Sequence, residues 1–331
     1  MYPAIPGKVH VLSSIDDFSH AVLNMPLYAY QIRPLTAVID SVFHHHGHEF
    51  LLVFSRQSGK NEAVAHLLVY LLNIYQRRGG NMVFAAIGDG IGRGQRRLHE
   101  RLDNPWNRHE WRKAAGPART MLGRSAVVFI SSHPQAAARG ETADHLLVID
   151  ELQDQDPLQL EAVFTPMRAA GNATAVYLGT VRSRHDALWR KKEELQRLEA
   201  ADKLQRVFWA GPQLVTAANP DYGRFLQAQV ARYGRNHPII ASEYYLEPLD
   251  GGGGLFPARR LALMRGNHAR RRVPGGTGLY VALLDVGGQD EAATTALAQL
   301  ANPARDYTVC TIVEVIYPEG SAEPLLSLIH I

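Results

Sequence analysis

Short apolar runs recur along the first 180 residues and are separated by longer polar or mixed segments. The runs occupy residues 50–55, 82–87, 126–131, 145–150 and 175–180. Each is continuously apolar and rich in Val, Ile, Leu and Phe, as expected for strands that are buried on both faces of a parallel sheet. The pattern therefore predicts an α/β fold with a mainly parallel sheet flanked by helices.

Between the first two runs, apolar residues return every three or four positions. They are Val64, Leu67, Leu68, Leu71, Leu72 and Tyr75. This spacing places them on one side of a helix, which we predict over residues 61–78. Residues 184–205 are dense in helix formers and predict a second helix, and a third is expected at 222–233. The first strand, its loop and the first helix thus form one unit that leads into the next strand.

A change of composition after residue 250 predicts a second domain. Residues 251–276 begin with four glycines and end in Pro274-Gly275-Gly276, which is typical of a linker. Two further strands are predicted beyond it, at 280–286 and 307–317.

The expected organisation has four parts. They are a first domain over 1–250, the linker over 251–276, an incomplete second domain over 277–325, and a tail over 326–331. The tail is similar to a translated sequencing adaptor, so we expect it to be non-native.

Composition excludes several classes of protein. Lys and Arg number 35 against 32 Asp and Glu, and the net charge of +3 is too small to indicate a nucleic-acid partner without local clustering. The single cysteine, Cys310, excludes an internal disulfide and favours a buried structural thiol. No apolar stretch approaches the roughly 18–20 residues of a membrane helix, so we expect no membrane partner and a cytoplasmic location.

The first apolar run leads directly into a polar loop that precedes the predicted helix. The loop is Ser55-Arg56-Gln57-Ser58-Gly59-Lys60-Asn61. Backbone N–H groups at such a loop and helix start can surround a polyphosphate, and Lys60 would add a charge to the outer phosphates. Phe54 replaces the usual first glycine of a phosphate-binding loop, and Asn61 stands where Ser or Thr would hold magnesium. The loop by itself also fits a helix start that happens to carry Gly-Lys.

The run at 145–150 ends in two acids, Asp150 and Glu151. Strands of open α/β sheets bind ligands at this end. In P-loop ATPases the first acid belongs to the magnesium shell, and the second orients or deprotonates the attacking water. An acidic pair at an ordinary helix start is the competing interpretation, which the order of the two motifs on one sheet disfavours.

With both motifs placed, the chain resembles the large subunit of the phage terminase family over residues 26–315. A loop that lacks the first glycine and carries Arg56 looks like the family's variant Walker A motif. Tyr30-Gln31 looks like its adenine-reading glutamine motif, and residues 131–140 are similar to a stretch that ends in Arg-Gly. Asp150-Glu151 resembles its Walker B motif. Leu178-Gly179-Thr180 looks like the coupling motif that senses the γ-phosphate.

The resemblance implies a P-loop ATPase that drives double-stranded DNA into a procapsid in the host cytoplasm. ATP would be bound by Gln31 and residues 55–61, with Arg56 stabilising charge on the γ-phosphate. Mg²⁺ would be held by Asp150 and Asn61, although an asparagine amide is a weaker ligand than the usual hydroxyl. Implied partners are a portal protein and a small terminase subunit, on a homo-oligomeric ring assembled at the procapsid.

The resemblance also implies that the second domain begins a ribonuclease H-like nuclease. Such sites hold two Mg²⁺ or Mn²⁺ ions with clustered carboxylates. Asp285 matches the first acid, and Asp306 fits an Asp-x-Thr element near the same site. Asp290 and Glu291 lie between the predicted strands, where we expect them to be solvated.

Basic residues and histidines form further clusters along the chain. Arginine and lysine are concentrated at Arg93, Arg96, Arg97, Arg101, Arg108, Arg112, Lys113, Arg119 and Arg124, with Trp106 and Trp111 among them, and again at Arg259, Arg260, Arg265, Arg270, Arg271 and Arg272. Such clusters fit phosphate contacts of DNA or, alternatively, a solvated face. Histidines at 44, 45, 46 and 48 invite a metal-site interpretation, which we disfavour because adjacent helical residues point in different directions.

Two other functions remain open from the sequence. A helicase-like ATPase acting on DNA would use Gln31, Lys60 and the acidic pair equally well, but it needs a second ATPase lobe. A non-catalytic prophage remnant is favoured only by Asn61.

Overall fold

The computed structural model describes residues 11–114, 118–133, 140–249, 279–285, 309–316 and 325–329. The chain divides into two compact units, Met1–Gly254 and Leu255–Ile331. The expected linker, residues 251–276, lies outside the described residues. No described helix has the length and apolar character needed to cross a membrane.

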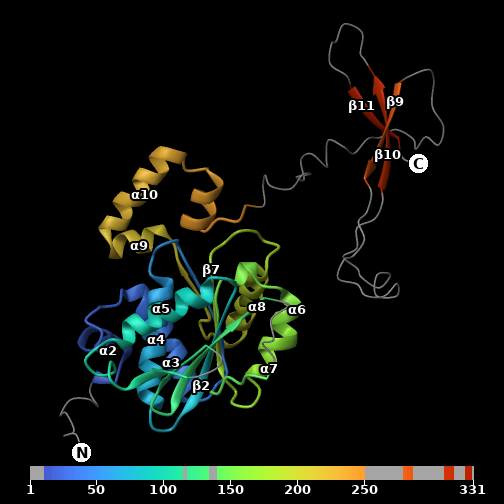
Figure 1. The fold of residues 1–331 in the computed structure, drawn as a ribbon. Coiled ribbons are helices and arrows are strands. Elements are labelled where there is room, and N and C mark those ends of the chain that lie inside the picture. Colours follow the sequence, from blue (N-terminus) through green and yellow to red (C-terminus); the bar gives the residue numbers. More distant parts are fainter. Residues whose placement is uncertain are drawn as a thin grey trace, which may run out of the picture. The chain divides into compact units, whose positions relative to one another are not determined.

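The first unit is built on an eight-stranded sheet in the order β3-β4-β5-β2-β6-β7-β1-β8 (Figure 1). The strands are β1 (Glu49–Phe54), β2 (Gly80–Ala86), β3 (Trp111–Lys113), β4 (Arg119–Leu122), β5 (Ser125–Ser131), β6 (Leu146–Ile149), β7 (Thr174–Gly179) and β8 (Val207–Ala210). The run from β5 to β8 is parallel, and β3 and β4 add an antiparallel hairpin at one edge. The predicted mainly parallel sheet is confirmed. The hairpin and β8 were not foreseen, since none of the three forms a long apolar run.

Alternation along each buried strand divides the core into two layers. In β1, Phe50 and Leu52 pack into one hydrophobic cluster, whereas Leu51 and Val53 belong to the other. Successive side chains of a strand point to opposite faces, so a continuously apolar strand fills both layers. This arrangement is why the apolar runs show no polar alternation.

Helices cover both faces of the sheet (Figure 1). One layer receives α2 (Ile15–Ala21), α3 (Ala29–Phe43), α4 (Lys60–Tyr75) and α5 (Gly90–Leu102). The other receives α8 (Ala187–Asp202) and the helical segment formed by α6 (Pro157–Gln159), η2 (Leu160–Phe164) and α7 (Thr165–Met167). A further group follows β8: α9 (Pro212–Ala218), α10 (Pro220–Tyr233) and the π-helical turn η3 (Ile240–Tyr244). The three helices predicted from sequence correspond to α4, α8 and α10.

The described part of the second unit is a three-stranded antiparallel sheet in the order β11-β10-β9. Its strands are β9 (Leu279–Asp285), β10 (Val309–Ile316) and β11 (Leu325–Ile329). The first two correspond to the strands predicted from sequence. The third falls largely within residues 326–331, where we expected a non-native tail, and it pairs with β10 from Leu325 to Ile329.

Candidate nucleotide-binding site

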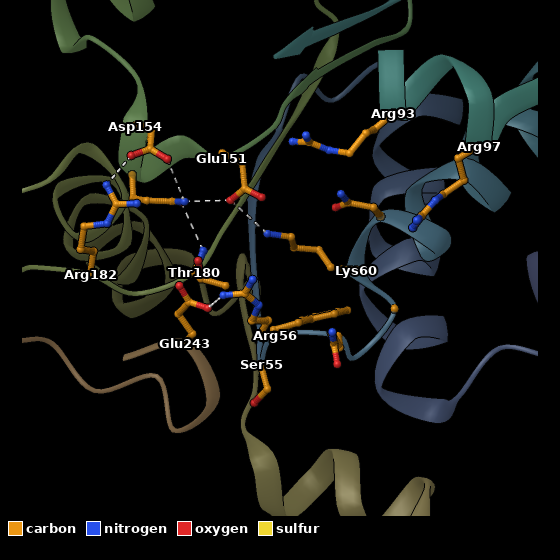
Figure 2. A pocket seen from close by; sticks show the side chains of 15 residues that line it. Ser55, Arg56, Lys60, Arg93, Arg97, Glu151, Asp154, Thr180, Arg182 and Glu243 are labelled. Atoms are coloured by element: carbon orange, nitrogen blue, oxygen red, sulfur yellow. Dashed lines mark hydrogen bonds and ion pairs between the residues drawn. The ribbon is translucent and has the colours of Figure 1, made fainter. Parts of the chain in front are cut away.

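The carboxyl ends of three neighbouring strands, β1, β7 and β6, open onto a cavity of about 490 Å³ (Figure 2). It is lined by Phe54, Ser55, Arg56, Gln57, Gly59, Lys60, Asn61, Arg93, Arg97, Glu151, Gln153, Asp154, Thr180, Arg182 and Glu243. Because β7 lies between β1 and β6, its end at Thr180 is placed between the predicted phosphate loop and the predicted acids. Five of the lining residues are cationic and three are carboxylates, an excess that suits an anionic ligand.

The loop from β1 to α4 has the backbone of a phosphate cradle. Gln57 and Gly59 adopt left-handed conformations, with φ of 61° and 82°. Such turns direct neighbouring N–H groups inward, and α4 begins at Lys60 directly behind them. A side chain at position 59 would be strained and would lie 2.5 Å from Gln31 Nε2, so glycine is required there.

Lys60 and Glu151 face each other across the cavity, with 3.6 Å between Nζ and Oε2 (Figure 2). Burial by itself raises the pKa of Glu151, but Lys60 and a hydrogen bond from Gln153 outweigh it and lower that pKa. Glu151 is therefore charged at neutral pH, as a group that orients or deprotonates water must be. Its backbone is left-handed, with φ 49° and ψ 57°, which sequence patterns do not reveal.

The two expected magnesium ligands differ in access. Asn61 lines the cavity, and its buried Oδ1 has no hydrogen-bond partner among the described residues. Asp150 is 2% exposed and does not line the cavity, and burial raises its pKa despite the opposing charge of Lys60. An orphaned amide oxygen and a nearby carboxylate form the oxygen donor set that Mg²⁺ takes, so these residues fit the ion.

Arg56 is held by the η3 turn. Its guanidinium forms an ion pair with Glu243, and its backbone N–H donates to Glu243 O at 2.8 Å. Half of the Arg56 side chain is exposed. The neighbouring Ser55 donates its hydroxyl to Tyr244 O at 2.7 Å, so Ser55 has a structural role in this state.

Gln31 and Ser58 belong to a second cavity of about 240 Å³ that shares Gln57 and Gly59 with the first. The Gln31 amide is bonded at both ends: Nε2 donates to the carbonyls of Ser58 and Gly59, and Oε1 accepts from Tyr28 N–H. Adenine recognition by Gln31 stays a prediction. It would require the Gln31 amide to replace its hydrogen bonds to the backbone with hydrogen bonds to the base. Ser58 likewise donates its hydroxyl within the loop, to Ser55 O at 2.6 Å.

The predicted coupling residues end β7. Thr180 lines the cavity, whereas Gly179 is packed behind it. Thr180 N–H donates to Gln153 Oε1, and Gln153 Nε2 donates to Glu151. The end of β7 is thus connected to the acidic loop after β6. A role in sensing the γ-phosphate stays a prediction.

Sequence reasoning missed several cavity residues, among them Arg93 and Arg97. We had grouped these two arginines with other basic residues as a DNA-binding or solvated stretch, but α5 brings both to the cavity (Figure 2). Their i, i+4 spacing directly after a strand end was the available signal. Trp106 and Trp111 of the same stretch pack against the core, and His99 stacks on Trp111 at 4.6 Å.

The histidine run does not lie on a helix, contrary to our expectation. The helix α3 ends at Phe43, and left-handed His45 turns the chain so that His46 stacks on His44 at 5.4 Å. Potential ligand atoms of Asp40, His44 and His46 lie within 4.8 Å of one another. All three residues are exposed and lie away from the nucleotide cavity.

Several expected residues have no described surroundings. Asp285 ends β9, but the position of its side chain is not described. Asp306, Asp290, Glu291, the Arg139 of the Arg-Gly stretch and the basic cluster at 259–272 lie outside the described residues.

Comparison with solved structures shows that the fold of this chain is similar to that of phage large terminases. The large terminase of bacteriophage HK97 aligns with a TM-score of 0.55 and 15% identity over 92% of this chain and 63% of that one. The chain has the large-terminase fold. A large terminase from a thermophilic bacteriophage aligns with a TM-score of 0.50 and 14% identity, covering 89% of this chain and 66% of that one.

The terminase resemblance expected from the sequence motifs is confirmed at the level of the fold by these solved structures. No protein-family model matches the sequence, and comparison with curated proteins gives no match. The chain spans 63% of the length of the HK97 enzyme. The predicted fold class is confirmed.

Proposed function

We propose that this chain is the ATP-hydrolysing motor of a phage-type DNA-packaging terminase. One observation carries the proposal: on a large-terminase fold, Lys60 of the phosphate loop faces the charged carboxylate of Glu151 at 3.6 Å across a cationic cavity. A polyphosphate in the loop would meet backbone N–H groups, the start of α4 and Lys60 together. Glu151 would then face a water beside the terminal phosphate.

The contacts of Lys60 and Arg56 suggest how ATP binding would prepare the reaction. Lys60 Nζ holds Glu151 Oε2 before ATP arrives, and a bound γ-phosphate is a stronger partner for this ammonium. Transfer of Lys60 to the phosphate would release the carboxylate to orient and deprotonate water. Arg56 would exchange Glu243 for the phosphate in the same way, which adds positive charge where negative charge develops.

A magnesium ion would be held by Asn61 Oδ1 and Asp150, the two candidate oxygen donors beside Lys60. The bound ion would neutralise charge on the phosphate oxygens. Burial raises the pKa of Asp150, and the positive charge of the ion would favour its ionised form.

Packaging itself rests on the fold and on the proposed ATPase site. In this proposal the motor moves double-stranded DNA into a procapsid as a homo-oligomeric ring, with a portal protein and a small terminase subunit as partners. The second unit would belong to a ribonuclease H-like nuclease, with Asp285 and Asp306 as ligands of Mg²⁺ or Mn²⁺.

Phosphate release by the purified chain, with and without linear double-stranded DNA, tests the proposal. We expect magnesium-dependent ATP turnover that DNA increases. Absence of turnover would overturn the ATPase assignment. Turnover that ignores DNA at low ionic strength, where phosphate contacts are strongest, would overturn the packaging role.

A further inference from the structure

The loop after β6 contains a residue that joins the predicted catalytic acid to the end of β7. Gln153 Nε2 donates to Glu151 Oε2 at 2.8 Å, and Gln153 Oε1 accepts the backbone N–H of Thr180 at 3.2 Å. A single side-chain amide therefore spans the two strand ends that flank the cavity. Neither the composition of this loop nor the motifs of the sequence indicated such a role.

A primary amide satisfies both of these neighbours of Gln153. A backbone N–H can only donate and an ionised carboxylate can only accept, so the residue between them must offer an acceptor and a donor. A glutamate at position 153 would repel Glu151, and an asparagine is one methylene too short to keep both bonds. These two partners also define the orientation of the amide, because the atom that accepts from Thr180 N–H must be the oxygen.

The packing of Gly179 supports this contact. A Cβ at position 179 would lie 2.5 Å from Gln153 Oε1 and 2.3 Å from Leu188 Cδ1. The φ of Gly179 is not in the left-handed region, so backbone conformation does not require glycine there. Close approach of both the Leu188 side chain and the Gln153 amide leaves little room for a Cβ there, which gives a physical reason for the glycine in Leu178-Gly179-Thr180.

The geometry leaves one oxygen of Glu151 for the reaction. Both Gln153 and Lys60 contact Oε2, so Oε1 is the oxygen that would orient the attacking water. When Lys60 moves to a phosphate, Gln153 continues to hold Oε2. We infer that Gln153 is a positioning residue, which fixes the Glu151 carboxylate for water activation and ties it to Thr180. This inference rests on the proposed ATPase function.

Gln153→Met keeps the length of the side chain and removes the hydrogen bonds to Glu151 and Thr180, together with a longer one from Nε2 to Asp154 Oδ2 at 3.4 Å. A hydrogen bond to a charged group contributes about 1.5–3 kcal/mol, so we expect kcat to fall about ten- to a hundredfold. The Kd of a fluorescent ATP analogue should stay at its wild-type value, because the amide contacts neither the phosphate loop nor Lys60. Gln159→Met is the matched control: Gln159 is a buried glutamine that donates to His133 O at 3.0 Å, and its loss should leave kcat unchanged.

A double-mutant cycle with Glu151→Gln separates positioning from general support of the fold. If Gln153 acts through the carboxylate, adding Gln153→Met to Glu151→Gln should reduce single-turnover hydrolysis no further. An equal reduction in both backgrounds, or loss of nucleotide affinity that matches the loss of kcat, would overturn the inference. Unchanged kcat in Gln153→Met would overturn it as well.

Failure of the proposed function and misfolding of the variant can both be told apart from failure of this inference. If wild-type protein shows no turnover, the proposed function fails before Gln153 is tested. If Gln153→Met does not fold, Gln153→Asn retains polarity but cannot span both partners, and it should show the same loss of kcat. Wild-type kcat in folded Gln153→Asn would contradict the positioning role.

Discussion

At the scale of single residues, the site is set by side chains whose partners would change in the proposed reaction cycle. Lys60 forms an ion pair with Glu151, and Arg56 forms one with Glu243. Glu151 also occupies a left-handed backbone conformation, which costs a non-glycine residue about 1–3 kcal/mol. Such strain is typical of functional positions, and here it turns the carboxylate toward Lys60.

Lys60→Ala tests the residue on which the phosphate loop depends. Loss of one preorganised charge at the transferred phosphate should reduce ATP turnover about 10²–10³-fold. The fold should persist, because Gln153 still holds Glu151. Phosphate release and thermal unfolding measure the two effects. Lys192→Ala is the control: this lysine lies over Trp189, on α8, and its loss should leave turnover intact. Wild-type turnover in Lys60→Ala would contradict the phosphate-loop assignment.

At the scale of elements, the phosphate loop is docked to a helical group that is distant in sequence. Ser55 and Arg56 contact the turn η3 through Tyr244 and Glu243, nearly 190 residues further along the chain. A change in the contacts of Ser55 or Arg56 on phosphate binding would therefore act directly on η3, which belongs to the same helical group as α9 and α10. The loop Thr180–Arg182 has a similar position, since Arg182 O accepts from Leu249 N–H at 2.9 Å.

Glu243→Gln should strengthen ATP binding. The substitution frees Arg56, which otherwise must leave its ion pair before it can meet a phosphate. Because the pair is partly exposed, it contributes at most about 1 kcal/mol, and the Kd for ATP should fall by no more than about fivefold. Equilibrium titration with a fluorescent ATP analogue measures the change. Glu247→Gln removes a similar pair, with Arg235, and should not alter Kd. An unchanged or higher Kd in Glu243→Gln would exclude this competition.

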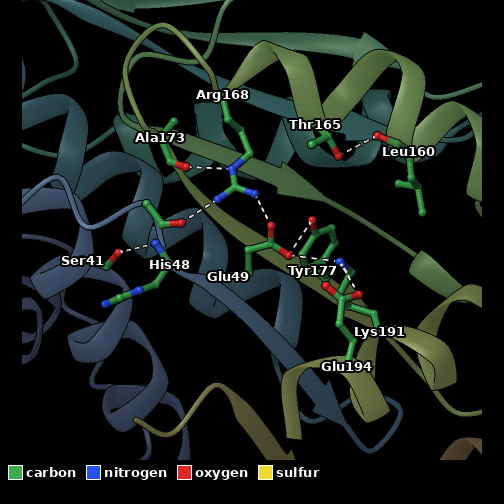
Figure 3. A network of polar contacts seen from close by, with 11 residues as sticks. Ser41, His48, Glu49, Leu160, Thr165, Arg168, Ala173, Tyr177, Lys191 and Glu194 are labelled. Atoms are coloured by element: carbon green, nitrogen blue, oxygen red, sulfur yellow. Dashed lines mark hydrogen bonds and ion pairs between the residues drawn. The ribbon is translucent and has the colours of Figure 1, made fainter. Parts of the chain in front are cut away.

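At the scale of the whole first unit, a partly buried polar network lies at the opposite end of the sheet (Figure 3). Glu49, the first residue of β1, forms ion pairs with Arg168 and with Lys191, the latter at 3.1 Å. Tyr177 donates its hydroxyl to Glu49 at 3.3 Å. The network joins β1 and β7 to α8 and to the segment after α7, so it connects the strands to the helical layer beside them.

Glu49→Gln should destabilise the protein in a pH-dependent way. Burial by itself raises the pKa of Glu49, but Lys191 and Arg168 outweigh it and lower the pKa below 4.5. The carboxylate therefore stabilises the fold above pH 4.5, and this contribution is lost as pH falls through the lowered pKa. At pH 7 the free energy of unfolding should fall by about 1.5–3 kcal/mol.

Denaturant unfolding at pH 7 and at successively lower pH measures the effect of Glu49→Gln. The difference from wild type should shrink as the pH falls below 4.5. Glu194→Gln, which removes an exposed partner of Lys191, should cost under about 1 kcal/mol at any pH. A Glu49→Gln difference that does not depend on pH would show that the charge of this carboxylate is not what stabilises the sheet.

Much of this architecture follows from local sequence. Continuously apolar runs identified five of the parallel strands, because burial on both faces leaves no polar alternation. Helical spacing identified α4, and Gly59-Lys60 at its start identified the phosphate loop. The short strand β8 and the hairpin of β3 and β4 were not predicted, because strands of three or four residues show too little periodicity to be recognised from sequence.

Sequence by itself determined the chemical groups of this site: the loop with Lys60, the acids Asp150 and Glu151, and the strands that carry them. Tertiary structure decided which groups meet. The insertion of β7 between β1 and β6 places Thr180 against Gln153, and the docking of η3 places Glu243 on Arg56. Strand order and docking arise from packing between segments that are far apart in the chain, whereas periodicity and motifs report only on neighbours along it.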